Sequence, residues 1–211
     1  MSQDKTSGIH DWVADQSGWG AFLATQRDRL KRMVALRLDD RLRGRVEASD
    51  VIQEAFLEAT QRLPEYAREP APMPPFLWLR FLTLQSLQIT HRRHLGAKSR
   101  DAGREISIHG AASPAASSAA IAAHLLGRET RASEVFLRSE RKFRLQEALN
   151  TMDVLDREVL ALRHFEQLSN GEVAQLLGLG ESASTKRYIR ALKRLKDILS
   201  TLPGAGTGFW L

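Results

Sequence analysis

Apolar residues recur three or four positions apart along most of the chain, and this spacing predicts an all-α protein. Helices are expected over 22–43 and 50–63, the second with a capping box formed by Asp50 and Gln53. A third helix, apolar on nearly every side, begins just after Pro75 and should be the centre of a bundle. No stretch shows the strict alternation of apolar and polar residues that marks a strand.

Two shifts in composition divide the chain. Five of the seven prolines fall between 64 and 75, and this density indicates a stiff loop because proline is not tolerated repeatedly inside a helix. Residues 107–118 are mostly Ser, Ala, Gly and Pro with almost no charge, which is typical of a linker. A short helix of its own is expected over 119–128.

Further helices follow the linker, so that the chain is expected to form two small helical domains. These helices are predicted over 141–150, 153–165, 169–177 and 182–199. The expected division is an N-terminal extension at 1–19, a first domain at 20–105, a linker at 106–137, a second domain at 138–200 and a tail at 201–211.

The second domain ends in a helix-turn-helix pattern. Ser169 and Glu172 have the spacing of a capping box, so a helix should begin there. Gly178 stands where that helix must end in a left-handed residue, a conformation in which glycine carries no Cβ penalty. The second helix of the pattern has six basic residues and no acidic one between Ser182 and Lys196.

This second helix has the residue types that enter the major groove of DNA. Base edges require short polar side chains and cations near the start of the helix, and phosphates require cations farther along. The base-edge candidates are Ser182, Ser184, Thr185, Lys186 and Arg187, and the phosphate candidates are Arg190, Lys193 and Arg194. An ordinary helical hairpin with a solvated basic face is the alternative, which the cap, the turn and the one-sided charge together disfavour.

Charge and composition agree with a globular protein that binds a polyanion. Apolar residues make up 43% and charged residues 27%, and the net charge is +6. The chain has no cysteine, which excludes disulfides, zinc ribbons, iron–sulfur clusters and cysteine nucleophiles. Neither a signal peptide nor a membrane-spanning stretch is evident, so we expect a soluble, cytoplasmic protein without membrane insertion.

Enzyme motifs are missing from the sequence. There is no G-x-x-x-x-G-K-[ST], no H-E-x-x-H and no G-x-S-x-G, so we expect no catalytic residue and no cofactor. His91 and His94 are spaced as a metal pair, but no third ligand is near them in the sequence. We therefore expect no metal site.

The order of these motifs resembles that of bacterial sigma factors of the sigma-70 family, in the small extracytoplasmic-function (ECF) group. The family's fourth region, which binds the −35 promoter element, is similar to DREVLALRHFEQLSNGEVAQLLGLG followed by KRYIRALKRLK. The second region, which binds the polymerase clamp and melts the −10 element, is similar to ASDVIQEAFLEATQRLPEY, then PFLWLRFLTLQ, then HRRHLGAKSRDAGRE. The resemblance covers 20–105 and 138–200.

The resemblance implies two partners, core RNA polymerase and promoter DNA. The motif D-x-x-Q-E-x-F assigns clamp binding, on the largest polymerase subunit, to Asp50, Gln53, Glu54 and Phe56. Contact with the −10 element falls to Arg80, Gln85, Gln88, His91, Arg92 and Arg93, and the loop 63–75 matches the place where the family captures a flipped base. The basic helix of the second domain would contact the −35 element.

The residues themselves support a protein partner for the helix that starts at Asp50. Between Val46 and Glu58 there are four acidic residues and no basic one, so this face is unsuited to DNA. A stand-alone helix-turn-helix regulator with an N-terminal sensor or oligomerisation domain is the alternative function, although it leaves the acidic helix unexplained. An anti-sigma protein is a further partner that the resemblance leaves open.

Overall fold

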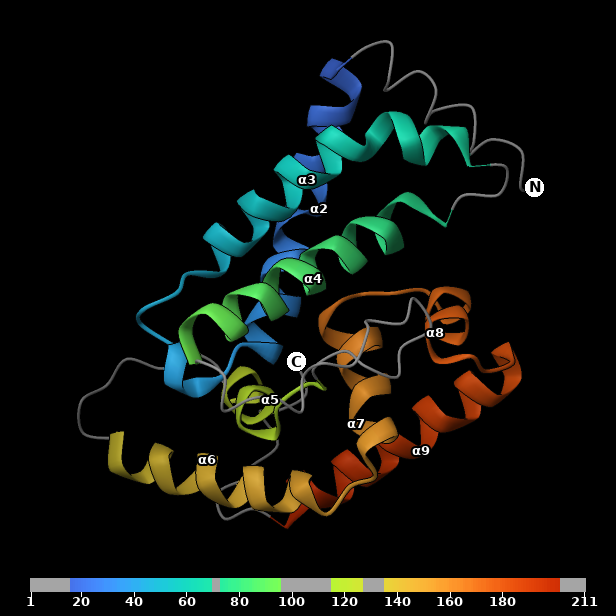
Figure 1. Ribbon diagram of the computed structural model, residues 1–211. Helices are drawn as coiled ribbons and strands as arrows, with labels where there is room; N and C mark the ends of the chain where they lie inside the picture. Colours follow the sequence, from blue (N-terminus) through green and yellow to red (C-terminus); the bar gives the residue numbers. More distant parts are fainter. Residues whose placement is uncertain (1–15, 70–72, 96–114, 127–134, 202–211) are drawn as a thin grey trace. The chain divides into compact units, whose positions relative to one another are not determined.

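The structure is a computed structural model that describes residues 16–69, 73–95, 115–126 and 135–201. Contacts between residues divide the chain into two compact units, Met1–Pro114 and Ala115–Leu211. Both units are built from helices, and no strand is present in the ranges described (Figure 1). The all-α prediction is confirmed.

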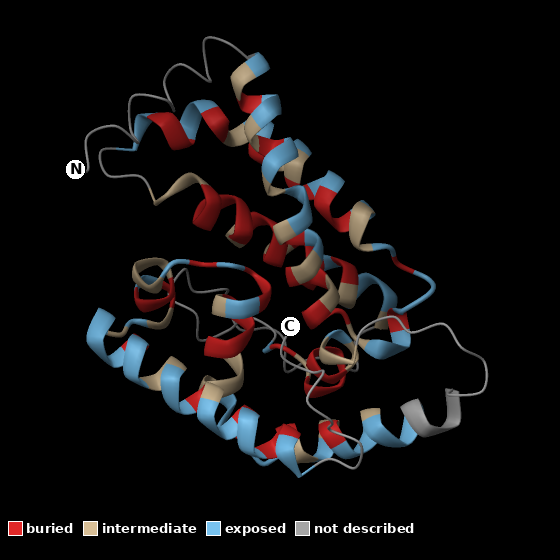
Figure 2. Ribbon diagram, turned by 180° about the vertical axis from the view of Figure 1, so that it is seen from behind, coloured by how far each residue is buried: buried red, intermediate tan, exposed pale blue. Residues whose placement is uncertain are grey.

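In the described part of the first unit there are three long helices. They are α2 (Gln16–Arg37), α3 (Ala48–Arg68) and α4 (Pro75–Leu95), with a short 3-10 turn, η1 (Asp40–Leu42), between the first two. Each of the three helices packs against the other two. Helix α4 is buried along most of its length, as its continuous apolar sequence predicts (Figure 2).

Helix α2 begins earlier than the sequence pattern suggests. Trp19, which we placed in the N-terminal extension, is 2% exposed and donates a hydrogen bond from Nε1 to Thr60 Oγ1 at 3.0 Å. Its ring stacks on Phe22 with centroids 5.4 Å apart and lies 6.3 Å from the ring of Trp78. Because these contacts bury a large aromatic side chain, the residues from Gln16 onward belong to the first unit.

Helix α3 differs from the prediction at both ends. It begins at Ala48 with Glu47 at the N-cap position, so Asp50 lies inside the first turn and the predicted capping box is wrong. The helix also continues through Pro64 to Arg68, where we expected a loop. Pro64 costs one backbone hydrogen bond, but Tyr66 and Ala67 beyond it are buried, and their packing holds the last turn in place.

The described residues of the second unit form six helical segments. They are α5 (Ser118–Leu125), α6 (Val135–Asn150), α7 (Val154–Leu160), the π-helical turn η4 (Ala161–Phe165), α8 (Asn170–Leu177) and α9 (Glu181–Ser200). Helix α5 lies in the segment expected to be linker, yet it packs against α6 and its Ile121 is fully buried. The Ala116 N–H donates to Glu158 Oε2 at 3.0 Å, which ties the start of this segment to α7.

Several sequence-based expectations lie outside the described residues. These are the extension up to residue 15, the prolines within 70–72, the linker at 96–114 and 127–134, and the tail from 202 to 211.

A hydrogen bond joins the loop before α3 to the last turns of α4. The Asp39 backbone N–H donates to His91 Nε2 at 3.3 Å, so His91 must be neutral at that nitrogen. Burial lowers the pKa of His91; the Asp39 carboxylate opposes this shift and Arg41 adds to it. Hydrogen bonds from Arg41 lower the pKa of Asp39 to about 2, so this carboxylate is ionised throughout the range in which histidine titrates.

We therefore expect the first unit to lose stability as the pH falls through the ordinary pKa of histidine, about 6.5. The folded pKa of His91 lies below the unfolded one, so the unfolded chain binds the proton more tightly. As the pH drops, protonation therefore stabilises the unfolded chain relative to the folded one. Chemical unfolding followed by Trp19 and Trp78 fluorescence measures the effect. His91→Gln, whose amide oxygen can still accept the bond, should flatten the decline, whereas His94→Gln at an exposed position should not. Equal declines in His91→Gln and wild type would contradict this role of His91.

Candidate nucleic-acid and protein interfaces

The turn between α8 and α9 has the geometry predicted from the sequence. Glu172 N–H donates to Ser169 Oγ at 3.2 Å, and Ser169 N–H donates to Glu172 Oε2 at 2.7 Å. Gly178 ends α8 with φ 62° and ψ 33°, the left-handed conformation that only glycine adopts without strain. The capping box and the glycine turn are therefore both confirmed.

A second set of contacts fixes how α9 leaves this turn. Asn170 Nδ2 donates to the Glu181 carbonyl at 3.0 Å, joining the first residues of the two helices. A Cβ on Gly171 would lie 3.3 Å from Glu181 Oε1, so glycine permits the close approach of the Glu181 side chain. Gly171 is a weak helix former, and this approach explains its place in the first turn of α8.

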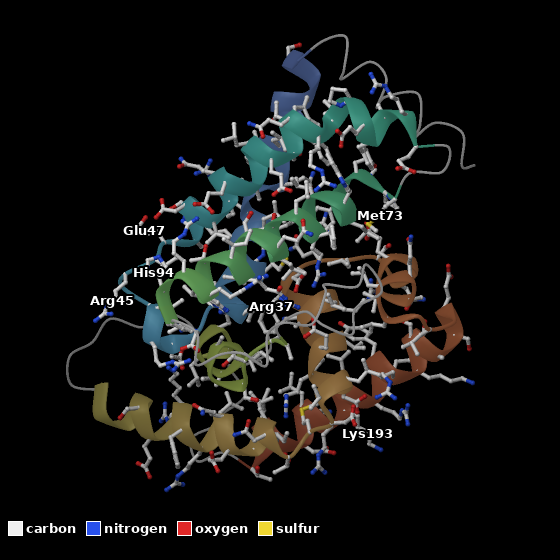
Figure 3. The ribbon with its side chains drawn as sticks, viewed as in Figure 1. Arg37, Arg45, Glu47, Met73, His94 and Lys193 are labelled. Carbon is white, nitrogen blue, oxygen red and sulfur yellow. The ribbon has the colours of Figure 1, made fainter. Side chains whose placement is uncertain are left out.

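Burial determines which side of α9 faces outward. Ala191, Leu195, Ile198 and Leu199 are buried where α9 packs against α6, α7 and α8. Lys193, on the opposite side, lies exposed on α9 (Figure 3). The predicted DNA contacts that are exposed are Ser182, Thr185, Lys186, Arg190, Lys193 and Arg194. They form a basic face, and we use this name for these six residues.

Ser184 is not on the basic face. It is 0% exposed and lies seven residues before Ala191, which puts both on the buried side of the helix. The prediction that Ser184 reads a base edge is wrong, because its hydroxyl cannot reach a ligand outside the domain. A small side chain is required here so that α9 can pack closely.

Arg187 is not on the basic face either. Its Nη1 lies 2.6 Å from Asp156 Oδ1 and 3.3 Å from Asp153 Oδ1, and its side chain is only 26% exposed. Asp153 also accepts hydrogen bonds from the backbone N–H groups of Leu155 and Asp156, so the same carboxylate caps α7. The structure therefore assigns Arg187 to the junction of α7 and α9, where the sequence predicted a base contact.

One residue of the exposed side of α9 was missed. Ile189 is 59% exposed and lies between Lys186 and Lys193 at helical spacing. Sequence reasoning counted only polar and charged residues as candidates, although the spacing alone would have placed Ile189 on this side.

The acidic helix α3 presents a mixed face. Asp50, Gln53 and Glu54 are exposed as predicted, whereas Phe56 is half-buried. Leu57, which the motif did not include, is 62% exposed and follows Gln53 by four residues. An exposed leucine beside acidic side chains suits a protein partner better than a polyanion.

Helix α4 offers fewer outward polar groups than predicted. Arg80 is 5% exposed and Gln88 is 6% exposed, so neither can contact DNA from this conformation. Both are among the many buried residues of α4. The remaining candidates are Gln85 and His91, which are half-buried, and Arg92 and Arg93, which are exposed.

The acidic and basic candidate faces of the first unit touch. Arg93 Nη1 lies 3.5 Å from Glu54 Oε1, with the two side chains 61% and 48% exposed. A solvent-exposed pair of this kind is worth at most about 1 kcal/mol. It can therefore be broken when either side chain finds a better partner.

The described part of the proline-rich segment is held by an aromatic stack. The Tyr66 hydroxyl donates to the carbonyl of Met73, which lies just before α4 (Figure 3). The Tyr66 ring stacks on Trp78 with centroids 4.1 Å apart and an angle of 11° between planes. Burial raises the pKa of Tyr66, so the hydroxyl stays protonated as a donor.

Two features were not found in the described part of the chain. No group of three or more His, Asp or Glu side chains could hold a metal ion there. Within the same ranges, no helix is both long enough and apolar enough to span a bilayer.

Comparisons with known proteins agree with this geometry. Residues 142–195 match the family model described as sigma-70, region 4. A probable RNA polymerase sigma factor, RfaY, from Xanthomonas campestris pv. campestris is 30% identical over 152 residues, or 72% of this chain. The chain spans about a third of that relative's length, 34%. The solved structure of CnrH in complex with the cytosolic domain of CnrY matches with a TM-score of 0.50 and 19% identity, covering 93% of this chain and 97% of that one.

We expect the contact of Arg187 with Asp156 to stabilise the second unit. A double-mutant cycle of Arg187→Ala and Asp156→Ala, measured by urea unfolding with circular dichroism, should give a coupling energy of about 1 kcal/mol. Arg190→Ala, on the exposed side of the same helix, should change stability by less than about 0.5 kcal/mol. Additive single changes would show that Arg187 does not hold α9 against α7.

Proposed function

We propose that the chain is an ECF-type sigma factor of the sigma-70 family that binds core polymerase and selects promoters at their −10 and −35 elements. The match of residues 142–195 to sigma-70 region 4 and the similarity to a probable RNA polymerase sigma factor support this proposal. The observation that carries the proposal is the basic face of α9, presented by a helix-turn-helix with a capped first helix and a glycine turn. In this proposal the chain does no chemistry, holds no cofactor, and lends the polymerase surfaces that read DNA.

We assign polymerase binding to the exposed face of α3. Asp50, Gln53 and Glu54 offer acceptors to a basic protein surface, and Leu57 adds an apolar anchor among them. The partner surface is the clamp region of the largest subunit, as the family resemblance implies. Phe56 is half-buried, so its role is to support the helix from beneath.

We assign the −10 element to the end of α4. Arg92 and Arg93 are exposed cations, and Gln85 and His91 are half-exposed polar groups on the same helix. Tyr66, by holding Met73 just before this helix, fixes one end of the segment expected to capture a flipped base.

We assign the −35 element to the basic face, with a division of labour along α9. Residues near the start of the helix meet base edges, so Ser182, Thr185 and Lys186 take this role. Arg190, Lys193 and Arg194 lie farther along and meet phosphates.

The domain arrangement and the cellular setting follow from the same proposal. We place the −10 and clamp surfaces in the first unit and the −35 surface in the second, and the site of action is the cytoplasm, where polymerase and promoter meet. CnrH was solved with the cytosolic domain of another protein, CnrY. This supports an anti-sigma protein as a further partner of the present chain.

Co-purification with core polymerase, followed by transcription in vitro on genomic fragments, tests the proposal. A sigma factor should bind core polymerase, start transcription at discrete sites, and bind duplex promoter poorly on its own. A stand-alone helix-turn-helix regulator would bind duplex DNA without polymerase and would start no transcription. That result would overturn the proposal.

Glu54→Lys should weaken binding to core polymerase at least tenfold. The change places a cation on the acidic face, beside Arg93, where a basic partner would be repelled. Glu65→Lys, an equally large charge change at an exposed position three turns along the same helix, is the matched control and should bind nearly as wild type. Unchanged binding by Glu54→Lys, with a native circular dichroism spectrum, would remove α3 from the interface.

Lys193→Ala should weaken use of all promoters by a similar factor and lower the salt slope of DNA binding by about one unit. A phosphate contact carries charge but no sequence information. Lys186→Ala is the comparison, because it should relax preference at one upstream position. Transcription from a library with a randomised upstream element measures both. If both variants merely rescale the same preference, the base-reading role of Lys186 is refuted.

A further inference from the structure

Ile189 is an exposed apolar side chain among the cations of α9. Its 59% exposure is high for a residue of this size. Among the described side chains of the second unit, Phe143 and Val154 are the other large apolar ones that are exposed. Neither of those two lies on α9. An isolated exposed isoleucine needs no explanation in itself, so its position has to carry the argument.

That position is the middle of the exposed side. Ile189 follows Lys186 by three residues and precedes Lys193 by four, and these are the spacings of neighbours on a helix surface. Ala191, two residues later, is about 200° away around the helix and fully buried. Ile189 therefore projects where Lys186 and Lys193 project, and whatever they bind must also meet its alkyl group.

We infer that Ile189 reads the C5-methyl group of a thymine in the upstream promoter element, an inference that rests on the proposed function. The edges of the bases in the major groove present donors and acceptors, and the thymine methyl is the apolar group among them. Isoleucine forms no hydrogen bond, so the methyl is the feature of the groove that it matches. The cations on either side attract phosphates and thereby bring this side chain against the bases.

The pairing of Arg187 with Asp156 strengthens the inference, because it leaves fewer side chains of α9 free to contact bases. With Ser184 buried and Arg187 held by Asp156, few side chains in the first half of α9 can specify a base. Thr185, Lys186 and Ile189 lie within one turn of each other on the exposed side. Sequence preference must then come from a short set in which Ile189 is the largest apolar member.

The helix geometry also places the thymine relative to other bases. Lys186 and Ile189 are separated by about 4.5 Å along the helix axis, which is more than one but less than two base-pair steps of about 3.4 Å. A lysine ammonium suits the O6 and N7 acceptors of guanine. We therefore expect the methyl-sensitive thymine within one or two base pairs of a guanine whose preference depends on Lys186.

Replacing thymine by uracil tests the contact, since it removes the methyl and keeps base pairing. The full chain is combined with core polymerase on a promoter selected from the randomised library, and each upstream thymine is replaced in turn. Wild type should lose about fourfold in promoter use at one thymine, as expected for one buried methyl group. Ile189→Ala should lose a similar factor on the thymine template and nothing further on the uracil template.

Two further variants serve as controls. Ile189→Val retains a branched alkyl group and should remain sensitive to the methyl. Val154→Ala removes a similarly exposed apolar side chain, 57% exposed, from α7 of the same unit and leaves the exposed side of α9 unchanged, so it should behave as wild type. Both Ile189 and Val154 are exposed, so native circular dichroism is expected for every variant.

The failure of this inference is distinguishable from failure of the proposed function. If wild type starts transcription but no thymine is sensitive to its methyl, or if Ile189→Ala keeps the uracil effect, the inference is overturned and the sigma role stands. If Ile189→Ala weakens every template equally, Ile189 contacts something other than the methyl and the inference is likewise overturned. If wild type starts no transcription on any template, both proposals fall together.

Discussion

The burial of one side of α9 against α6, α7 and α8 determines what the second unit can present to a ligand. Once Ala191, Leu195 and Ile198 are taken into the core, the opposite side of the helix is fixed to within part of a turn. The glycine turn at Gly178 and the contact of Asn170 with the Glu181 carbonyl set the direction in which the helix leaves α8. Every residue proposed to touch DNA in this unit depends on that packing.

Sequence alone predicted the elements better than the direction of single side chains. Helical spacing, the capping box at Ser169 and the glycine turn are local features, so the sequence was sufficient for them. Ser184 and Arg187 were misplaced because their environment is set by partners far away in the chain: Ser184 by close helix packing, and Arg187 by Asp153 and Asp156, 34 and 31 residues away. From sequence alone, a basic residue that contacts DNA could not be distinguished from one, such as Arg187, that forms an ion pair within the domain.

The first unit shows the same limit in another form. The sequence identified α4 as the central helix, yet Arg80 and Gln88 were still assigned to DNA because their residue types suited it. On a helix that is buried on nearly all sides, the polar residues are buried as well. Burial, not residue type, therefore decides which of its side chains can contact a ligand. The continuation of α3 through Pro64 has a similar origin. Burial of Tyr66 and Ala67 stabilises the last turn of the helix, and the number of prolines in the sequence does not indicate this burial.

The charges of the two units are arranged differently, and this bears on how a sigma factor would engage DNA. In the second unit Asp153 and Asp156 neutralise Arg187 alone and leave Lys186, Arg190 and Lys193 exposed. In the first unit Glu54 pairs with Arg93, so a residue proposed to bind polymerase partly neutralises one proposed to bind DNA. A basic polymerase surface that competes for Glu54 would release Arg93, and the Arg93 guanidinium would then be available to a phosphate. Because the pair is exposed and weak, it would prevent neither of the two proposed contacts.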